Sequence, residues 1–558
     1  MDSTYVGAKS LYYRNYQSNI AKTTTKKLEA SNITKDFALP DETKNPNSAF
    51  YGNIYKDTYG LPLSAFGVSS FKQIRTEWIH YLPWLATSLL NYRSNGQSND
   101  TSSFTTITSK LFVKNRTSYV VGDVFVAHIQ ARDQLMRNKM FGGDYFRARL
   151  IRTRFGEAVD GIPCAIYDHA NGTYTVKAPL LMSGDFTLEV KLLLSVEGID
   201  RWIKFTELGE YKVVIHTAVL KSMELVYCGI HLTTFKRYSP EKLCDYSNPR
   251  NQEPWFCVRP PSGICHPIVQ YRHRLLPWRP PFQISVDSLK EYGKFGEVFG
   301  SSVRIKIIKK DPIIWNVTYG MEYKGTSIPA GYLRNDRWVS LQQKSPVISL
   351  AWSRNCFKNK VIYMVGDSTM RQFFEIAVAV FNLTQTGPSN KINRHASQLG
   401  QDKTVNITIY YRTHGVPVSV RGVPGTRPYI SDTIETLKTG GPALYVIFNI
   451  GVHLLHYDTS YFVHRILKIR DAIADHLRIF PDTRFILRGL NVVETMEEWA
   501  IFRLEFILRE VFKSLIGVLF LNFWDYTTVS PLKHYHPGEH ALNEEALLLF
   551  SYVCNWPK

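Results

Sequence analysis

The region from residue 106 to 218 alternates apolar and polar positions over short stretches separated by turn residues. The segments "SYVVGDVFVAHIQARD" and "FRARLIRTRF" show this pattern, and "NGTYTVKAPLLMSGDFTLEVKLLL" holds two such stretches joined by Ser-Gly-Asp. A period of two is typical of half-buried strands, and Ser-Gly-Asp favours a tight turn between them. Short strands at this spacing predict a β-sandwich over 106–218.

The region from 331 to 558 follows a different pattern, in which short apolar runs alternate with segments of helical spacing. The expected strands are Val361–Val365, Val405–Arg412, Ala443–Asn449, Arg484–Leu490 and Val518–Trp524. Helices are expected between them, notably at "YFVHRILKIRDAIADHLRIF" and "EEWAIFRLEFILREVFKSLI". This alternation predicts a three-layer α/β domain with a parallel sheet, where ligands bind at the carboxyl ends of the strands.

Two further regions complete the predicted organisation. Residues 1–105 are rich in Ser, Thr, Asn and Tyr and are expected to be mostly disordered or extended. Within them, Phe71–Tyr92 is apolar enough to form a docked helix, broken at Pro83. Residues 219–330 contain clustered cysteines and the stretch "LLPWRPPF", so they are expected to form a disulfide-stapled connector.

The chain has seven cysteines, and four of them fall within 38 residues of the connector. These four are Cys228, Cys244, Cys257 and Cys265. Their spacings fit no common zinc pattern, so a local disulfide cluster is the better interpretation. An odd count leaves at least one thiol unpaired within the chain. A bridge between Cys356 and Cys554 at the ends of the C-terminal domain would leave Cys164 free.

Seven N-x-S/T sequons accompany the cysteines, at Asn32, Asn99, Asn115, Asn171, Asn316, Asn382 and Asn406. Sequons and disulfides together favour the secretory pathway, either the Golgi lumen or secretion. The opening "MDSTYVGAKSLYYRNYQSN" has no apolar core, so it does not read as a signal peptide, and we expect the true N-terminus to lie outside this sequence. No run of 18 apolar residues occurs, so no transmembrane helix is expected in this chain.

The net charge is +19, with a pI near 9.4, but the basic residues are scattered along the chain rather than gathered in one run. None of the usual nucleic-acid-binding motifs is present, so we expect no nucleic-acid partner. An acidic glycan and a membrane surface are equally good electrostatic partners.

The stretch "VIYMVGDSTMRQFFE", residues 361–375, carries the first candidate chemistry. An apolar strand ends at Gly366, and helical spacing begins at Thr369. Asp367 or Ser368 can accept a hydrogen bond from the first free N–H groups of the helix. The same geometry lifts the Ser368 hydroxyl to the carboxyl edge of the sheet. The stretch alone leaves two alternatives open, a nucleophilic serine and a helix-capping serine.

A nucleophilic serine needs a base, an acid and an oxyanion hole, and the strand ends supply candidates for each. Ser368 N–H and the Asn449 side chain in "FNIGVHLL" are candidate oxyanion donors. Asp525 in "FWDYTT" is a candidate acid. The candidate bases, all in "LKHYHPGEH", are His534, His536 and His540.

Together these motifs resemble the SGNH hydrolase superfamily. More narrowly, "GDSTMRQ", "NIGVH", "FWDYT" and "HPGEH" resemble the PC-esterase-type domain of the neurexophilin and PC-esterase domain (NXPE) family. Upstream, "VGDVFVAHIQARD", "GGDYFRARL" and "NGTYTV" look like that family's immunoglobulin-like region, and "DHANGTYTVKAPLLMSGDFTLEVKL" also resembles a filamin-type repeat. The resemblance covers about residues 105–558, with the motifs in the expected order.

The resemblance implies a fold and a reaction class. Relatives of the PC-esterase domain transfer or remove acetyl groups on sugar hydroxyls, including those of sialic acids. Ser368 would take an acetyl group from a donor such as acetyl-CoA, and a glycan hydroxyl would then attack the acyl-serine while His536 moves the protons. Ser368 N–H, an N–H near Gly415 and Asn449 would hold the oxyanion. No bound cofactor and no metal would be required.

The resemblance also implies a substrate or donor region beside the nucleophile, formed by Asp367, Arg371 and His453. Arg371 lies one helical turn beyond Ser368, where it would either hold an acidic substrate or donor phosphate, or pair with a nearby carboxylate.

One position departs from the family pattern D-x-x-H-P, because "KHYHP" places Lys533 where the acid should be. A lysine cannot orient an imidazole as a carboxylate does, and its charge disfavours imidazolium. Either Asp525 supplies the acid, or a Ser–His dyad works at a reduced rate. Alternatively, the domain is catalytically silent, and the chain is a secreted binding protein of neurexophilin type whose partner is a glycan or a cell-surface receptor.

Overall fold

The computed structural model of this 558-residue chain describes most of residues 110–556. The described residues are 88, 110–113, 118–133, 136–206, 215–230, 240–248, 250–251, 253–275, 296–297, 303–308, 322–323, 326–343, 347, 349–387, 396–415, 428–457, 459–495 and 497–556. The predictions for residues 1–105, including the helix at Phe71–Tyr92, lie outside these residues apart from Ser88.

The C-terminal half is built on a seven-stranded sheet of order β21-β22-β23-β20-β24-β25-β26. Its strands are β20 (Val361–Gly366), β21 (Thr384–Thr386), β22 (Gln398–Asp402), β23 (Ile407–Thr413), β24 (Leu444–Phe448), β25 (Arg484–Arg488) and β26 (Val518–Leu521). Neighbours from β23 to β26 pair in parallel, whereas β21 and β22 form an antiparallel edge. The chain passes from β20 to β23 on one side and then to β24 on the other, so the strand order reverses at β20. Open α/β sheets bind ligands at such a switch point.

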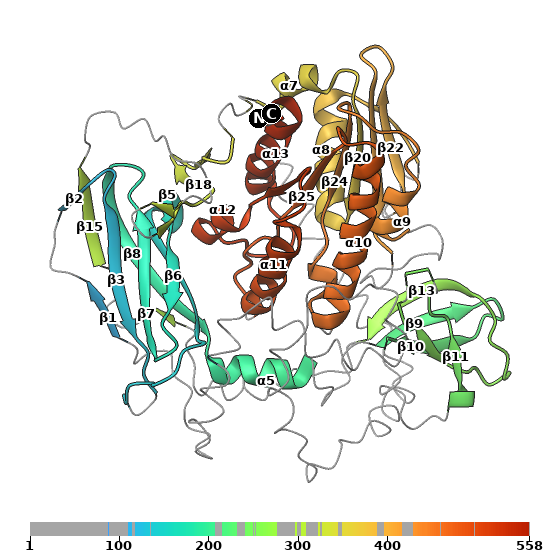
Figure 1. Cartoon of the computed structure of the whole chain (residues 1–558), viewed down its shortest axis with the longest axis horizontal. Helices are drawn as coiled ribbons and strands as arrows, with labels where there is room; N and C mark the ends of the chain where they lie inside the picture. Colours follow the sequence, from blue (N-terminus) through green and yellow to red (C-terminus); the bar gives the residue numbers. More distant parts are fainter. Residues whose placement is uncertain are drawn as a thin grey trace, which may run out of the picture.

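Helices cover both faces of this sheet (Figure 1), and we call the whole unit the α/β domain. The helices α8 (Ser368–Phe381) and α13 (Glu539–Cys554) share one core with Met364 and Ile447. On the other face, a second core joins Val446 and Phe448 to three helices. These are α9 (Ile430–Glu435), α10 (Thr459–Ile479) and α11 (Glu498–Phe512). Successive strand residues face opposite layers, as the period of two requires. The 3-10 turn η7 is Val452–Leu454, and α12 is Trp524–Val529.

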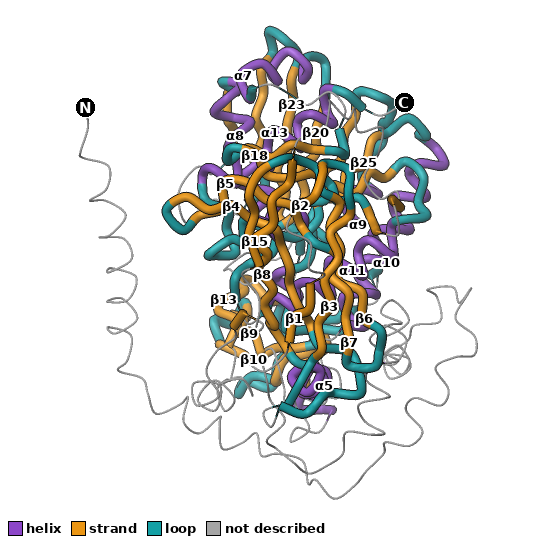
Figure 2. Tube along the Cα trace, turned by 90° about the vertical axis from the view of Figure 1, so that its left-hand side faces the viewer, coloured by secondary structure: helices purple, strands orange, loops and turns teal. Residues whose placement is uncertain are grey.

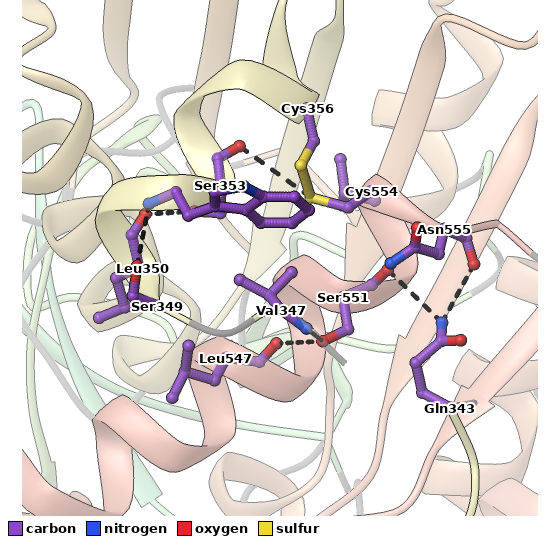
Figure 3. The surroundings of a disulfide bond; sticks show 12 residues. Gln343, Val347, Ser349, Leu350, Ser353, Cys356, Leu547, Ser551, Cys554 and Asn555 are labelled. Carbon is purple, nitrogen blue, oxygen red and sulfur yellow. Dashed lines mark hydrogen bonds between the residues drawn. A yellow bond between two sulfur atoms is a disulfide. The ribbon is translucent and has the colours of Figure 1, made fainter. Parts of the chain in front are cut away.

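A disulfide between Cys356 and Cys554 joins the two ends of the α/β domain, as the cysteine positions allowed (Figure 3). Cys356 lies in η6 (Arg354–Phe357), which follows α7 (Leu350–Ser353), and Cys554 is the last residue of α13. Around the bridge, Ser551 Oγ donates to Leu547 O at 2.7 Å and accepts from Val347 N–H at 2.8 Å. The start of the domain is therefore fastened to its last helix by a covalent bond and by hydrogen bonds.

Two sheets that enclose one core form the β domain (Figure 2). The four-stranded sheet contains β1 (Lys110–Val113), β3 (Val124–Gln130), β6 (Ala165–Asp168) and β7 (Thr173–Pro179). The other sheet contains β2 (Ser118–Val120), β4 (Tyr145–Arg154), β5 (Glu157–Pro163), β8 (Gly184–Leu194), β14 (Gly296–Glu297), β15 (Val303–Ile308), β18 (Gly331–Arg334) and β19 (Arg337–Ser340). Phe125 and Val176 from the first sheet meet Leu150 and Leu188 from the second.

The β domain extends beyond the 106–218 boundary expected from the sequence. β15 comes from the segment predicted as connector, and it pairs with β8. β18 and β19 come from the predicted start of the α/β domain, and β18 pairs with β5 through Leu333 and Gly161. The sequence pattern did not assign these strands to the β domain, because the partners of β15 and β18 in β8 and β5 lie 115 or more positions earlier in the chain.

A five-stranded sheet of order β11-β12-β10-β9-β13, here the cystine sheet, packs against the α/β domain. Its strands are β9 (Ile215–Leu220), β10 (Leu225–Gly229), β11 (Leu243–Asp245), β12 (Phe256–Val258) and β13 (Ile268–Leu275), with the 3-10 turn η5 at Pro240–Lys242. It contains the disulfides Cys228–Cys257 and Cys244–Cys265. Helix α5 (Val196–Thr206) connects the β domain to this sheet, and a small hairpin is formed by β16 (Glu322–Tyr323) and β17 (Thr326–Ser327).

These pairings confirm the predicted disulfide cluster, and Cys164 is the free cysteine. Three of the sequon asparagines fall in the described residues, and all three are exposed; they are Asn171, Asn382 and Asn406. None of the helices in the described part of the chain combines the length and the apolar character that crossing a bilayer requires.

Candidate functional site

Ser368 and His536 meet at the carboxyl edge of the parallel sheet. Ser368 is the first residue of α8 and follows β20 by one residue, as the strand–turn–helix pattern predicted. His536 lies in the loop 530–538 between α12 and α13. Its Nε2 lies 2.7 Å from Ser368 Oγ, which is hydrogen-bond distance for proton transfer between a base and a nucleophile. Of the three candidate bases, His536 is therefore the one that contacts Ser368.

The turn before Ser368 is packed against Asn449. Asp367 N–H donates to Asn449 Oδ1 at 3.1 Å, and Asn449 Nδ2 donates to Asp367 Oδ1 at 2.9 Å. A Cβ on Gly366 would lie 1.8 Å from Asn449 Oδ1, so the close approach requires glycine. One of the two Nδ2–H groups of Asn449 is thus used by the residue next to the nucleophile, and its role as an oxyanion donor stays a prediction.

Asp367 acts as the cap of α8. Its Oδ1 accepts from Thr369 N–H at 2.8 Å, so it satisfies one of the first amides of the helix. Burial would raise the pKa of the Asp367 carboxyl, but nearby His453, the Asn449 hydrogen bond and Arg488 together hold it below its usual value. A fixed negative charge therefore lies directly beneath the nucleophile turn.

A pair of histidines lies behind this carboxylate. His414 Nδ1 lies 2.8 Å from Gly415 O, and its Nε2 lies 2.8 Å from His453 Nδ1. A carbonyl oxygen only accepts, so His414 Nδ1 carries its proton. Burial, with smaller effects from His453 and Arg465, lowers the pKa of His414 to about 3. His414 is therefore neutral, and its Nε2 accepts from His453 Nδ1–H. No role was predicted for His414 from the sequence.

Gln372 connects the nucleophile helix to the base loop. Its Nε2 donates to Pro537 O at 3.3 Å, next to His536. Ser368 and Gln372 are four residues apart in one helix, so their side chains share a face. This contact was missed from the sequence, although the helical spacing from Ser368 was available as a signal.

The loop that carries His536 is also bound to the β domain and to the sheet. Lys533 Nζ lies 2.7 Å from Glu157 Oε1, and His540 Nε2 lies 3.4 Å from Asp336 Oδ1. Leu532 N–H donates to Val492 O at 3.1 Å. Lys533, which replaces the expected acid, therefore extends away from His536 to the hairpin between β4 and β5.

Asp525, the candidate acid, makes a hydrogen bond to the edge of the β domain. It lies in the first turn of α12, and its Oδ2 accepts from Ala330 N–H at 2.7 Å. Its N–H donates to Asn522 Oδ1 at 3.2 Å. Neighbouring α12 residues pack on the β domain, where Tyr526 and Val529 form an apolar cluster with Ile151 and Leu333. Asp525 therefore fastens α12 to the β domain.

Arg371 also lies close to the nucleophile, but its side chain is buried. Its Nη1 donates to Glu375 Oε1 at 2.6 Å, one turn further along α8. Of the two alternatives for Arg371, this contact matches the pairing with a nearby carboxylate.

A hollow of about 630 Å³ opens beside the same sheet edge, next to β22 and β23. Its lining includes Thr386, Gln398, Tyr410, Tyr411 and Arg412. The Tyr411 hydroxyl donates to Asp367 O at 3.3 Å, which places one wall of the hollow against the nucleophile turn. On the other side of β24, a smaller cavity is lined by His414, Gly415, Ser431 and Arg465. The described residues contain no cluster of three or more His, Cys, Asp or Glu side chains that would hold a metal ion.

Two family models match the chain. One is described as NXPE family member 4-like, C-terminal domain, and matches residues 338–554. The other is described as Neurexophilin and matches residues 93–277. The first match spans the α/β domain with Ser368 and His536, and the second spans strands β1 to β13 of the β domain and the cystine sheet.

Proposed function

Because the chain belongs to the NXPE family, we propose that its PC-esterase-like α/β domain moves acetyl groups to or from sugar hydroxyls through an acyl-serine intermediate. The observation that carries this proposal is the 2.7 Å contact between Ser368 Oγ and His536 Nε2 at the switch point of the sheet. We place the protein in the secretory pathway, because its three disulfides and its exposed sequon asparagines suit that compartment.

In the first half-reaction, Ser368 Oγ attacks the carbonyl carbon of an acetyl donor such as acetyl-CoA, and His536 Nε2 takes the hydroxyl proton. Ser368 N–H and an N–H near Gly415 are the candidate donors to the oxyanion. The thiol leaves with the proton from His536, and the acetyl group remains on Ser368. The hollow lined by Tyr410, Tyr411 and Arg412 is the candidate site for the donor.

In the second half-reaction, a sugar hydroxyl attacks the acetyl carbon of the acyl-serine. His536 removes the hydroxyl proton and returns it to Ser368 Oγ, which restores the free enzyme. With water as the acceptor, the same steps give an esterase. Because Lys533 stands where a carboxylate is expected, either Asp525 supplies the acid or Ser368 and His536 work as a dyad, at a lower rate than a triad.

Formation of the acyl-serine tests the proposal. Purified glycosylated protein is incubated with acetyl-CoA that carries a radiolabelled acetyl group, and protein-bound label is compared between wild type and Ser368→Ala. We expect label on the wild type alone. Label on neither protein, with both folded, would contradict the proposed activity with this donor.

A second candidate function is a silent α/β domain in a secreted binding protein. Two observations favour it: Lys533 replaces the expected acid, and Asp525 is engaged with Ala330. The Neurexophilin match over 93–277 supplies the candidate binding region. Capture of a cell-surface receptor by the Ser368→Ala protein, with no label on wild type in the acyl-serine experiment, would support this function.

A further inference from the structure

Two hairpin tips of the β domain lie next to the loop that carries His536. The first is Arg152–Glu157, between β4 and β5, and the second is Arg334–Arg337, between β18 and β19. Asp336 N–H donates to Val159 O at 2.7 Å and Asn335 N–H donates to Asp160 Oδ1 at 2.8 Å, so the second tip is docked on β5, two or three residues after the first tip. We call these two segments the rim.

The rim contacts the histidine loop on both sides of His536. Glu157 of the first tip pairs with Lys533, three residues before His536, at 2.7 Å. Asp336 of the second tip lies 3.4 Å from His540, four residues after it. His536 is itself exposed. Whatever approaches the Ser368–His536 pair from the side of the β domain therefore meets the rim.

The first tip carries an unusual residue. Phe155 has a φ of 52° and Gly156 a φ of 83°, as in a two-residue turn that needs the left-handed region at both positions. The neighbouring tip has the same backbone at Asn335 (φ 50°) and Asp336 (φ 62°), which are the residue types that such turns prefer. Phe155 is 99% exposed, the highest value among the large apolar side chains of the described residues. The aromatic ring is thus held in water, on a backbone that disfavours it.

The rim also carries surplus positive charge. Arg152 is paired with Asp160, and Arg337 with Glu544. Arg154 and Arg334 are exposed and make no side-chain ion pair or hydrogen bond with any described residue. Arg154 directly precedes Phe155 and Arg334 begins the second tip, so the rim presents two exposed guanidinium groups that are not paired with any described residue. Guanidinium groups bind carboxylates in bidentate fashion, and an aromatic face packs against the C–H groups of a sugar ring.

We infer that the rim, through Phe155, Arg154 and Arg334, is the docking surface for a carboxylated glycan chain whose hydroxyl is presented to Ser368 and His536. This inference rests on the proposed function and assigns its acceptor surface to the β domain. Charge complementarity favours a carboxylated glycan over a neutral one, because the rim presents cations that pair with no described residue and the whole protein has a net charge of +19. In this arrangement the β domain holds the acceptor glycan, and the α/β domain holds the reacting groups Ser368 and His536.

The test measures binding separately from turnover. The full-length Ser368→Ala protein is titrated with a fluorescent sialic acid trimer, and with a neutral maltotriose of the same length. We expect the acidic trimer to bind more tightly, with an affinity that falls as salt is added. Phe155→Asn, Arg154→Ser and Arg334→Ser should each weaken binding about tenfold. The matched controls are Ile516→Asn and Arg478→Ser, which change exposed residues elsewhere and should bind as the parent does.

Phe155→Asn gives a second, independent readout. Asn suits the left-handed turn better than Phe, so the variant should melt at or above the temperature of its parent while it binds the trimer more weakly. Equal binding by the rim variants and their parent would overturn the inference. So would a loss of binding to anionic vesicles, rather than to the trimer, in Phe155→Asn, since that result would make the tip a membrane contact.

The inference and the proposed function fail in different ways. On an active Ser368 background, rim variants should still become acetylated from acetyl-CoA at the wild-type rate, because that half-reaction needs no acceptor. If wild type is acylated but the Ser368→Ala protein with an intact rim does not bind the trimer, the inference about the rim is overturned. If the intact rim binds the trimer but wild type is not acylated, the acetyl-transfer chemistry is overturned.

Discussion

The two members of the Ser–His pair are held in opposite ways. Ser368 follows a buried turn in which Gly366, Asp367 and Asn449 fit together with no space for an added methyl group. His536 sits on an exposed loop that is held by the Gln372 hydrogen bond to Pro537 O and by the ion pair of Lys533 with Glu157 in the β domain. His540, at the start of α13, lies 3.4 Å from Asp336 of the same domain. The nucleophile is thus fixed by the core of one domain, whereas the base is held where two domains and a helix meet. Changes to the buried turn before Ser368, here the buried half of the site, should therefore affect stability. Changes to the loop around His536, the exposed half, should affect mainly the rate.

The largest expected effect comes from breaking the pair itself. Ser368→Ala and His536→Ala should each lower acetyl transfer by about 10⁴-fold, and the double variant should be no worse than either, because the two groups act as one unit. Thermal unfolding should be unchanged, since both side chains are at least partly exposed. Multiplicative losses in the double variant would show that the two residues act independently.

A methyl group at Gly366 is the strongest test of the buried half. Gly366→Ala places a Cβ 1.8 Å from Asn449 Oδ1, so the reciprocal pair between Asn449 and Asp367 must separate. The free energy of unfolding should fall by about 1–3 kcal/mol, as for other overpacked core sites, and turnover should fall with it. Chemical denaturation measures the change in the free energy of unfolding. Gly538→Ala is the control, because a Cβ at that position has no other atom within 4 Å.

The buried half should also respond to acid through His414. Its pKa in the folded protein, about 3, lies below the usual histidine value, so the unfolded chain binds this proton first as the pH falls. Stability should therefore decrease as the pH falls from about 6.5 towards 3, by at most about 1.4 kcal/mol per pH unit from this residue. His414→Gln should make the free energy of unfolding, measured from denaturation curves, less dependent on pH across this range. An unchanged slope would show that His414 is not the neutral, buried acceptor described.

Gln372 tests the exposed half without touching a reacting atom. Gln372→Leu keeps the bulk but removes the donor to Pro537 O, so His536 loses one of its restraints. We expect kcat to fall about tenfold with KM unchanged, because misplacement of a base acts on the chemical step. Unfolding should be nearly unaffected. A rise in KM instead would mean that Gln372 contacts the substrate rather than positions the base loop.

The smallest effect should come from Lys533. Lys533 and Glu157 are 73% and 69% exposed in their side chains, and exposed ion pairs contribute little to stability. Lys533→Ala should leave denaturation unchanged and lower the rate by no more than about threefold. Lys533→Asp should be slower than Lys533→Ala, because the new carboxylate faces Glu157. If Lys533→Asp were faster than wild type, the lysine would mark a decayed acid position.

The same contrast explains what the sequence could predict. The turn that carries Ser368 is encoded locally by a strand, a glycine, a capping aspartate and a helix, and all of these were recognised within fifteen residues. The surroundings of His536 depend on contacts with Glu157 and Asp336, which lie some hundreds of positions earlier and leave no periodic signal. For the same reason the contact of Asp525 could not be predicted: only the fold shows that the Ala330 N–H, at the edge of the β domain, donates to one of its carboxylate oxygens.

The cysteine pairing could be predicted only in part from the sequence. Their positions marked which thiols were close enough in sequence to form a cluster, and one long-range bridge was left among the alternatives. In the fold, Cys257 on β12 stands between Cys228 on β10 and Cys244 on β11. It bonds Cys228, whereas Cys244 bonds Cys265, and spacing alone specifies neither bond.

The membership of β15, β18 and β19 in the β domain has a consequence for how this protein is made. On the ribosome, β5 and β8 emerge long before the strands that will flank them, and the cystine sheet is synthesised in between. Until residue 340 has been translated, these strands remain unpaired edges that other chains can join. A fragment that ends at 277, where the Neurexophilin match stops, would keep those edges open. We expect such a fragment to aggregate, whereas the whole chain closes its own sheet late in synthesis.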